Sequence, residues 1–159
     1  MKKTTHFLTE QFPVFIEQVQ ENLQPLWGQM SAQHMIEHLA YIFNISNGKI
    51  EMSVMHSPEK IAKSKRHVFI YKNPFPKNLR VSTIPENPEP VKFESLAEAK
   101  KQLWITIDNF YTFFKDKPNK TSIHPFLGPL TYEEWVFFHT KHCSHHLTQF
   151  GLMDGEVTP

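Results

Sequence analysis

Residues 131–151 read TYEEWVFFHTKHCSHHLTQFG and carry the signals of a complete helix. Thr131 and Glu134 have the spacing of a capping box, in which each side chain bonds the backbone N–H of the other residue. Gly151 stands where a glycine commonly ends a helix. Four histidines lie within eight positions between these two ends. We therefore expect a helix with an unusual density of imidazoles.

Helical geometry sorts these histidines into different roles. At about 100° per residue, the side chains within about 80° of one another are His139, His142, His146 and Gln149. His142 and His146 have the i, i+4 spacing at which two imidazoles on adjacent turns bind one ion. His145 lies toward the edge of this face. The pair lacks the glutamate of an HExxH motif, which excludes a protease of the zincin type.

A second histidine pair, His34 and His38, lies in a predicted helix that begins at Ser31 and ends near Asn47 and Gly48. Packing this helix against residues 131–151 would bring three imidazoles together. Three neutral nitrogen ligands leave the charge of an ion uncompensated and one coordination position open. That combination is typical of a catalytic rather than a structural zinc site.

Two further helices are predicted. Residues 95–117 begin with a second capping box, Ser95 and Glu98, and repeat apolar residues at spacings of three and four. The apolar stripe consists of Leu96, Ala99, Leu103, Ile107, Phe110 and Phe114. Residues 10–24 form the first helix, in which Pro13 is tolerated only in the first turn.

Residues 50–94 contain six of the 12 prolines, so they cannot form a continuous helix. Their aromatic content predicts an ordered crossover packed on the helices, with HVFIY, residues 67–71, as a short extended segment. Residues 117–130 are predicted as a second loop. The resulting fold class is all-α, a four-helix bundle with one long Pro-rich crossover between helices 2 and 3.

Composition restricts the class of protein. The chain has 159 residues, which suits one domain over residues 1–159. With 17 basic and 16 acidic side chains, the sequence shows no electrostatic signature of nucleic-acid or membrane binding. The single cysteine, Cys143, excludes an internal disulfide and is predicted to be a buried, inert thiol. We expect a soluble, cytoplasmic protein with neither a nucleic-acid nor a membrane partner.

Three segments together resemble the DinB-like (YfiT-like) metal-binding four-helix-bundle superfamily. They are WGQMSAQHMIEHL (27–39), HPFLGPLTYEEW (124–135) and HTKHCSHHLTQFG (139–151). More narrowly, they are similar to a branch of unknown function in which HPFFG-type and HHxxQFG-type motifs recur. The resemblance implies a divalent ion, nickel or zinc, held by one histidine of the second helix and an HxxxH pair of the last.

Transferred to this sequence, the implied metal ligands are His38, His142 and His146. His34 remains the alternative on the second helix, because three residues separate Trp27 from Ser31 here, whereas many members have Trp and Ser adjacent. We prefer His38, which lies deeper in the helix. The candidate pocket residues are His139, His124, His34 and Gln149.

The resemblance also implies an activity. Characterised relatives are transferases and isomerases that use a low-molecular-weight thiol such as bacillithiol or mycothiol, and relatives frequently form homodimers. We therefore expect a divalent-metal-dependent enzyme that performs thiol-dependent S-transfer on small electrophiles. The alternatives are a metal-dependent hydrolase, a non-catalytic stress-related protein that binds metal or a small ligand, and a metal-free surface that senses pH.

Overall fold

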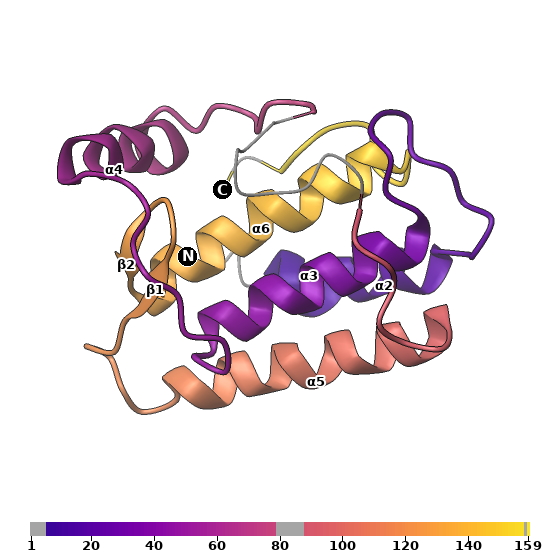
Figure 1. Ribbon diagram of the computed structural model, residues 1–159, viewed down its shortest axis with the longest axis horizontal. Coiled ribbons are helices and arrows are strands. Elements are labelled where there is room, and N and C mark those ends of the chain that lie inside the picture. Colours follow the sequence, from indigo (N-terminus) through magenta and orange to yellow (C-terminus); the bar gives the residue numbers. More distant parts are fainter. Residues whose placement is uncertain (1–5, 79–87, 158) are drawn as a thin grey trace.

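The computed structural model describes residues 6–78, 88–157 and 159, which form packed helices with a small sheet at one end (Figure 1). In chain order the elements are the π-helical turn η1 (Phe7–Gln11), α2 (Phe12–Gln18), α3 (Ala32–Ser46), α4 (Pro58–Lys65), the π-helical turn η2 (Arg66–Ile70), α5 (Leu96–Phe114), β1 (Ser122–His124), β2 (Gly128–Leu130) and α6 (Tyr132–Gln149).

The prediction of an all-α four-helix bundle is wrong. The described residues form five α-helices, and the chain is about 54% helical with an added two-stranded antiparallel sheet. The additional helix, α4, lies in the stretch predicted as a Pro-rich crossover that cannot form a continuous helix. It begins where the Ser57 side chain accepts a hydrogen bond from Lys60 N, with Pro58 in its first turn.

The segment HVFIY is also not extended, because η2 continues directly from α4. Its aromatic and β-branched residues favour a strand in isolation. Here Phe69 instead packs its ring against Phe137 of α6, with the centroids 5.3 Å apart. The tertiary contact therefore overrides the local preference. Part of the predicted crossover, residues 79–87, lies outside the described residues.

The three long helices form where the caps predicted them. Ser31 caps α3, Ser95 caps α5, and Thr131 forms a reciprocal capping box with Glu134 at the start of α6. After α6, Gly151 adopts a left-handed φ of 69°. The predicted starts of these helices and the glycine end of α6 are confirmed. At α5 only one bond of the predicted capping box forms, from Glu98 N to Ser95 Oγ, and the helix ends at Phe114 rather than at residue 117. The first helix is shorter than predicted, because α2 ends at Gln18 and the next residue has extended backbone angles.

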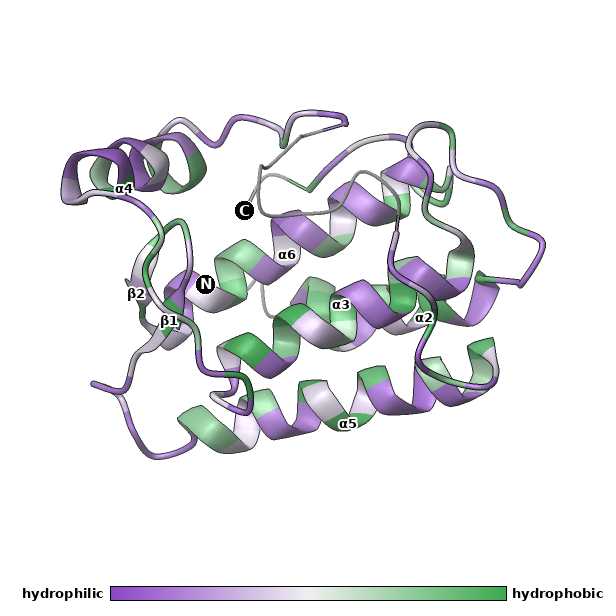
Figure 2. Cartoon of the chain, viewed as in Figure 1, coloured by the Kyte–Doolittle hydropathy of each residue, from purple (hydrophilic) through white to green (hydrophobic). Residues whose placement is uncertain are grey.

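Helix α3 lies between α5 and α6 (Figure 1) and forms the centre of the core. Phe43 of α3 meets Phe110 of α5 edge to face, with ring centroids 5.8 Å apart. Figure 2 shows that α4 is largely hydrophilic, and none of its residues is buried. Lys65 attaches it to the rest of the fold, by an ion pair with Glu134 and a hydrogen bond to the carbonyl oxygen of Pro129.

Residues 122–130, predicted as part of a loop, form a short hairpin in which Ser122 pairs with Leu130 and His124 with Gly128. Ser122 Oγ donates to the carbonyl oxygen of Ser46, which fixes the hairpin to the end of α3. Because β2 leads directly into the cap of α6, the hairpin helps to place α6 beside α3. Among the described residues, no helix has both the length and the apolar character needed to cross a bilayer.

Candidate metal centre

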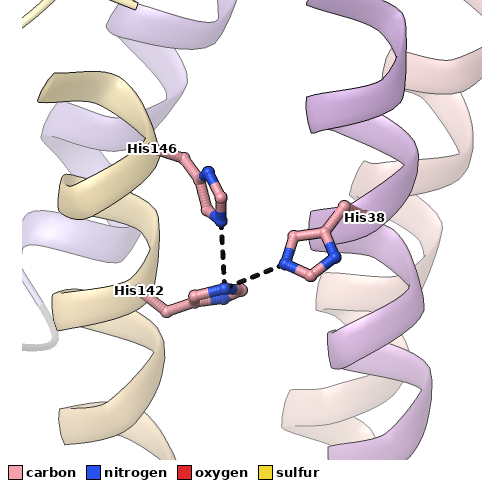
Figure 3. Close-up of side chains that lie close together, drawn as sticks. All are labelled: His38, His142 and His146. Carbon is pink, nitrogen blue, oxygen red and sulfur yellow. Dashed lines mark hydrogen bonds between the residues drawn. The ribbon is translucent and has the colours of Figure 1, made fainter. Parts of the chain in front are cut away.

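Helices α3 and α6 bring three histidines together, as Figure 3 shows. His38 comes from the middle of α3, and His142 and His146 come from successive turns of α6. Each offers a ring nitrogen, and these nitrogens lie within 4.8 Å of one another. The three residues predicted as ligands are therefore neighbours in the structure, at a spacing compatible with a metal ion.

The ring nitrogens converge closely. His142 Nε2 lies 3.0 Å from His38 Nε2 and 3.1 Å from His146 Nε2. Nitrogen ligands bound to one ion at about 2.0–2.1 Å lie about 2.9 Å apart at right angles and about 3.4 Å apart in a tetrahedron. The observed separations fall between these values. The donor set and these two separations are thus compatible with a bound metal ion.

The hydrogen-bond partners of Gln149 determine which nitrogen of His146 carries the hydrogen. Gln149 Nε2 donates to the carbonyl oxygen of Trp27 at 2.9 Å, so the amide oxygen faces His146. That oxygen lies 2.7 Å from His146 Nδ1 and can only accept. His146 therefore carries its hydrogen on Nδ1 and presents the lone pair of Nε2 to the other two rings, as a metal ligand requires.

Hydrogen bonds alone cannot satisfy this cluster. His142 Nε2 carries at most one hydrogen, yet it faces the Nε2 atoms of both His38 and His146. His146 Nε2 carries no hydrogen and can only accept. One of the two short contacts therefore lacks a full hydrogen bond in any assignment of hydrogens. A cation at the centre would satisfy all three lone pairs together.

All three imidazoles are neutral at pH 7. Burial, followed by the nearby His145 ring, lowers the pKa of His38 to about 4. Burial also holds the pKa of His142 and of His146 well below the ordinary value, and neighbouring histidines lower each further. Since a metal binds the neutral form of imidazole, the rings need lose no proton to act as ligands.

Gly28 makes the approach of Gln149 possible. Its φ is +80°, and a Cβ built on it would lie 2.8 Å from Gln149 Nε2. Glycine avoids both the backbone strain and the steric overlap. The segment WGQM therefore supports the centre through the Trp27 carbonyl group and the missing side chain of Gly28. Sequence reasoning had treated this segment as a motif without a role.

Glu156 is a residue of the site that sequence reasoning missed. Its Oε1 lies 2.7 Å from His145 Nδ1, and its Oε2 accepts a hydrogen bond from Phe75 N at 3.2 Å. The His145 ring also meets Trp27 edge to face, with centroids 5.9 Å apart. His145, predicted at the edge of the histidine face, therefore lies beside the cluster and has a carboxylate partner. No spacing pattern in the sequence links Glu156 to either residue.

His139 is a residue of the core and does not join the cluster. It is fully buried, and its ring stacks on Phe43 with centroids 3.7 Å apart and an angle of 9° between the planes. Ser46 Oγ donates to the carbonyl oxygen of Phe43, so it accepts from His139 Nε2 at 2.9 Å. Burial holds the pKa of His139 well below the ordinary value. The ring thus has a packing role.

The remaining candidate pocket histidines have local structural roles. His34 Nδ1 lies 2.8 Å from Ser31 Oγ and completes the cap of α3. His124 Nδ1 accepts hydrogen bonds from the N–H groups of Phe126 and Leu127 in the turn of the hairpin. Neither residue belongs to the converging group, to which α3 contributes His38.

Cys143 is a free, buried residue on the flank of α6. Burial raises the pKa of its thiol, which disfavours the reactive thiolate. The group of converging ligand atoms does not include it.

A family model described as "Protein of unknown function (DUF1569)" matches residues 16–153. The match spans most of the chain, both helices of the histidine cluster, and the supporting residues Trp27, Gly28 and Gln149. The chain therefore belongs to this family. No curated protein and no solved structure matches it.

Proposed function

We propose that this DUF1569 protein is a divalent-metal-dependent enzyme of the DinB-like type, with His38, His142 and His146 as metal ligands. The observation that carries the proposal is the convergence of three neutral Nε2 atoms, separated by 3.0 and 3.1 Å. Nickel and zinc are the proposed ions, because imidazole ligands suit both.

The proposed reaction is thiol-dependent S-transfer to a small electrophile. A divalent ion held by three neutral ligands keeps its positive charge and an open position, which favours the deprotonated form of a thiol or of water. Gln149 holds His146 in the tautomer that a ligand needs. Phe138 stacks on the His142 ring with centroids 5.4 Å apart and fixes its plane. These residues preorganise the centre without taking part in bond changes.

Metal content tests the first part of the proposal. Protein purified without a chelator or an affinity tag should contain close to one equivalent of nickel or zinc by elemental analysis. His142→Ala and His146→Ala should lose it, while the matched control His67→Ala, on the surface turn η2, should keep it. Equal metal content in all four proteins would refute the site.

Thiol-conjugation assays test the second part. Bacillithiol, mycothiol and glutathione would each be offered with a model electrophile, with and without added nickel or zinc. Metal-dependent conjugation that His38→Ala abolishes would support the transferase. Metal binding without turnover would favour the alternative, a metal-binding protein that does not catalyse. Hydrolysis of activated esters that needs no thiol would favour a metal-dependent hydrolase.

A further inference from the structure

The segment 72–78, KNPFPKN, crosses the face of α6 that carries His142 and has no regular secondary structure of its own. All its residues are exposed except Phe75, which is partly buried. The Phe75 ring lies 6.3 Å from the ring of His142 and 5.9 Å from that of His145, measured between centroids. This segment therefore covers two imidazoles with a single side chain.

Two ionisable side chains hold the segment in place. Lys141 is only 1% exposed, and its ammonium group donates to the carbonyl oxygens of Lys72 and Asn73 at 3.2 and 2.8 Å. The Glu156 carboxylate accepts from Phe75 N. All three are charge-assisted hydrogen bonds to backbone groups, which are stronger than neutral ones. Lys141 belongs to α6 and Glu156 to the C-terminal tail.

The backbone of the segment is suited to a discrete change of conformation. Lys72 and Asn78, at its two ends, have left-handed φ values of 54° and 53°. Such a value is unfavourable for lysine and persists where surrounding contacts hold it, whereas asparagine adopts it more readily than other residues with a side chain. Pro74 and Pro76 stiffen the chain on both sides of Phe75. The segment therefore has stiff central residues between two ends with left-handed backbone.

We propose that residues 72–78 form a strap latched over one side of the three-histidine centre by Lys141 and Glu156, and that Phe75 decides which ligands reach His142 from that side. The role of Phe75 in ligand selection rests on the proposed metal-dependent function, whereas the attachment of the strap by Lys141 and Glu156 does not. A ligand arriving from this side meets the rings of Phe75 and Phe138, which favour apolar over strongly hydrated groups.

Chemical labelling of histidine tests the strap without a metal. The full-length chain, freed of metal by a chelator, would be treated with diethyl pyrocarbonate, and labelling of each histidine followed by tandem mass spectrometry. The exposed His6 serves as the internal reference and the fully buried His139 as a sensor of general unfolding. In the native chain, His142 and His145 should label at least about tenfold more slowly than His6.

Three variants open the strap in different ways. Phe75→Ala removes the cover, Lys141→Met removes the donors but keeps an apolar stem, and Glu156→Ala removes the acceptor of Phe75 N. Each should speed the labelling of His142 about tenfold. For Lys141→Met and Glu156→Ala this is the worth of a hydrogen bond to a charged group in an opening equilibrium, and for Phe75→Ala the side chain that covers the ring is gone. His145 should respond in the same way in Phe75→Ala and Lys141→Met, but in Glu156→Ala it also loses its own carboxylate partner. His139 should stay unlabelled. Lys101→Met and Glu21→Ala, on exposed parts of the surface, are the matched controls and should change nothing.

Rates for His142 within about twofold of the native rate in all three variants would overturn the strap. Equal acceleration of His139 would also overturn it, because it would show general loosening of the fold. With metal bound, Phe75→Ala should accelerate removal of the metal by charged EDTA more than removal of the metal by uncharged phenanthroline. Equal acceleration with both chelators would refute the selecting role of Phe75. A native chain that binds no metal would refute both the proposed function and this selecting role, while the labelling would still decide the latch.

Discussion

At the scale of single residues, Gln149 decides which nitrogen of His146 is available to a ligand. We predict that Gln149→Leu lowers metal affinity about 10- to 100-fold, the usual effect of removing a partner that orients a ligand. The leucine has a similar volume but cannot bond His146 Nδ1 or the Trp27 carbonyl group. Competition with a chromophoric chelator would measure the affinity.

The matched control for this prediction is Gln102→Leu. Gln102 also bonds a side chain one turn away, Glu98, but it lies on α5 and has no contact with the histidines. It should leave the affinity unchanged. An unchanged affinity in Gln149→Leu would show that packing alone orients His146.

His124 contributes to the loss of stability in acid. Burial lowers the pKa of His124 from 6.5 to about 3. As the pH falls below 6.5, the unfolded chain binds a proton before the folded chain does, so stability is full above that pH and declines toward pH 3. We predict that His124→Asn, whose amide oxygen can accept from the same two N–H groups, makes this decline shallower by about 1.4 kcal/mol per pH unit.

Urea unfolding at several pH values between 7 and 4 would measure the slope. The stability of His124→Asn at pH 7 should be lower than that of the native protein, since the smaller side chain loses its contact with Phe138, and the difference should shrink as the pH falls. His67→Asn, at an exposed surface position, is the control and should keep the native slope. Parallel curves for native protein and His124→Asn would contradict the prediction.

Single residues also show what the sequence can and cannot reveal about the site. The i, i+4 spacing identifies His142 and His146 because both lie within one helix. The partner of His145 could not be found in this way, since Glu156 reaches it only through the path of the C-terminal tail. His38 rather than His34 reaches the histidines of α6, because the first turn of α3 uses His34 in its cap.

At the scale of elements, the caps of α6 and α4 should differ in their effect on stability. Thr131→Ala removes a reciprocal capping box from a helix with many buried residues, and we predict a loss of about 1–2 kcal/mol in the free energy of unfolding. Ser57→Ala removes the cap of α4, which has no buried residue. It should leave global unfolding unchanged and increase only the hydrogen exchange of residues 58–70.

Hydrogen exchange and denaturant unfolding of both variants would make the comparison. An equal loss of global stability in Ser57→Ala would show that α4 unfolds together with the core. Unchanged stability in Thr131→Ala would show that the backbone contacts of the hairpin alone hold the start of α6.

Strong local signals explain why α3, α5 and α6 could be predicted. Each has a capping side chain at its start, and α5 adds an apolar stripe that agrees with its position in the core. The η2 turn was mispredicted as extended because Phe69 packs against α6, a contact that local propensity does not report. Helix α4 was missed because the prolines of residues 50–94 outweighed its local start signal, Ser57 followed by Pro58. The hairpin was missed because its strands have only three residues each, too few to show an alternating pattern.

At the scale of the whole molecule, the histidine cluster joins parts of the chain that are far apart in sequence. His38 and His142 are 104 positions apart, and their contact connects α3 to α6. The core supports the same junction, because the His139 ring of α6 stacks on the Phe43 ring of α3. Any ion bound by the three histidines would therefore stabilise the packing of these two helices and not only a local turn.

We accordingly predict that zinc or nickel at about 100 times its dissociation constant raises the free energy of unfolding by about 2.7 kcal/mol. For a chain of this size, the thermal midpoint should rise by about 5–10 °C. His38→Ala leaves α6 intact with both of its histidines but removes the ligand from α3, so it should lose most of this rise. Thermal scans with and without metal would measure the rise in the thermal midpoint. The control is His34→Ala, which removes a ring that serves only the cap of α3 and should keep the full rise. A full shift in His38→Ala would mean that the ion binds α6 alone, and that the two helices are held together by their apolar contacts.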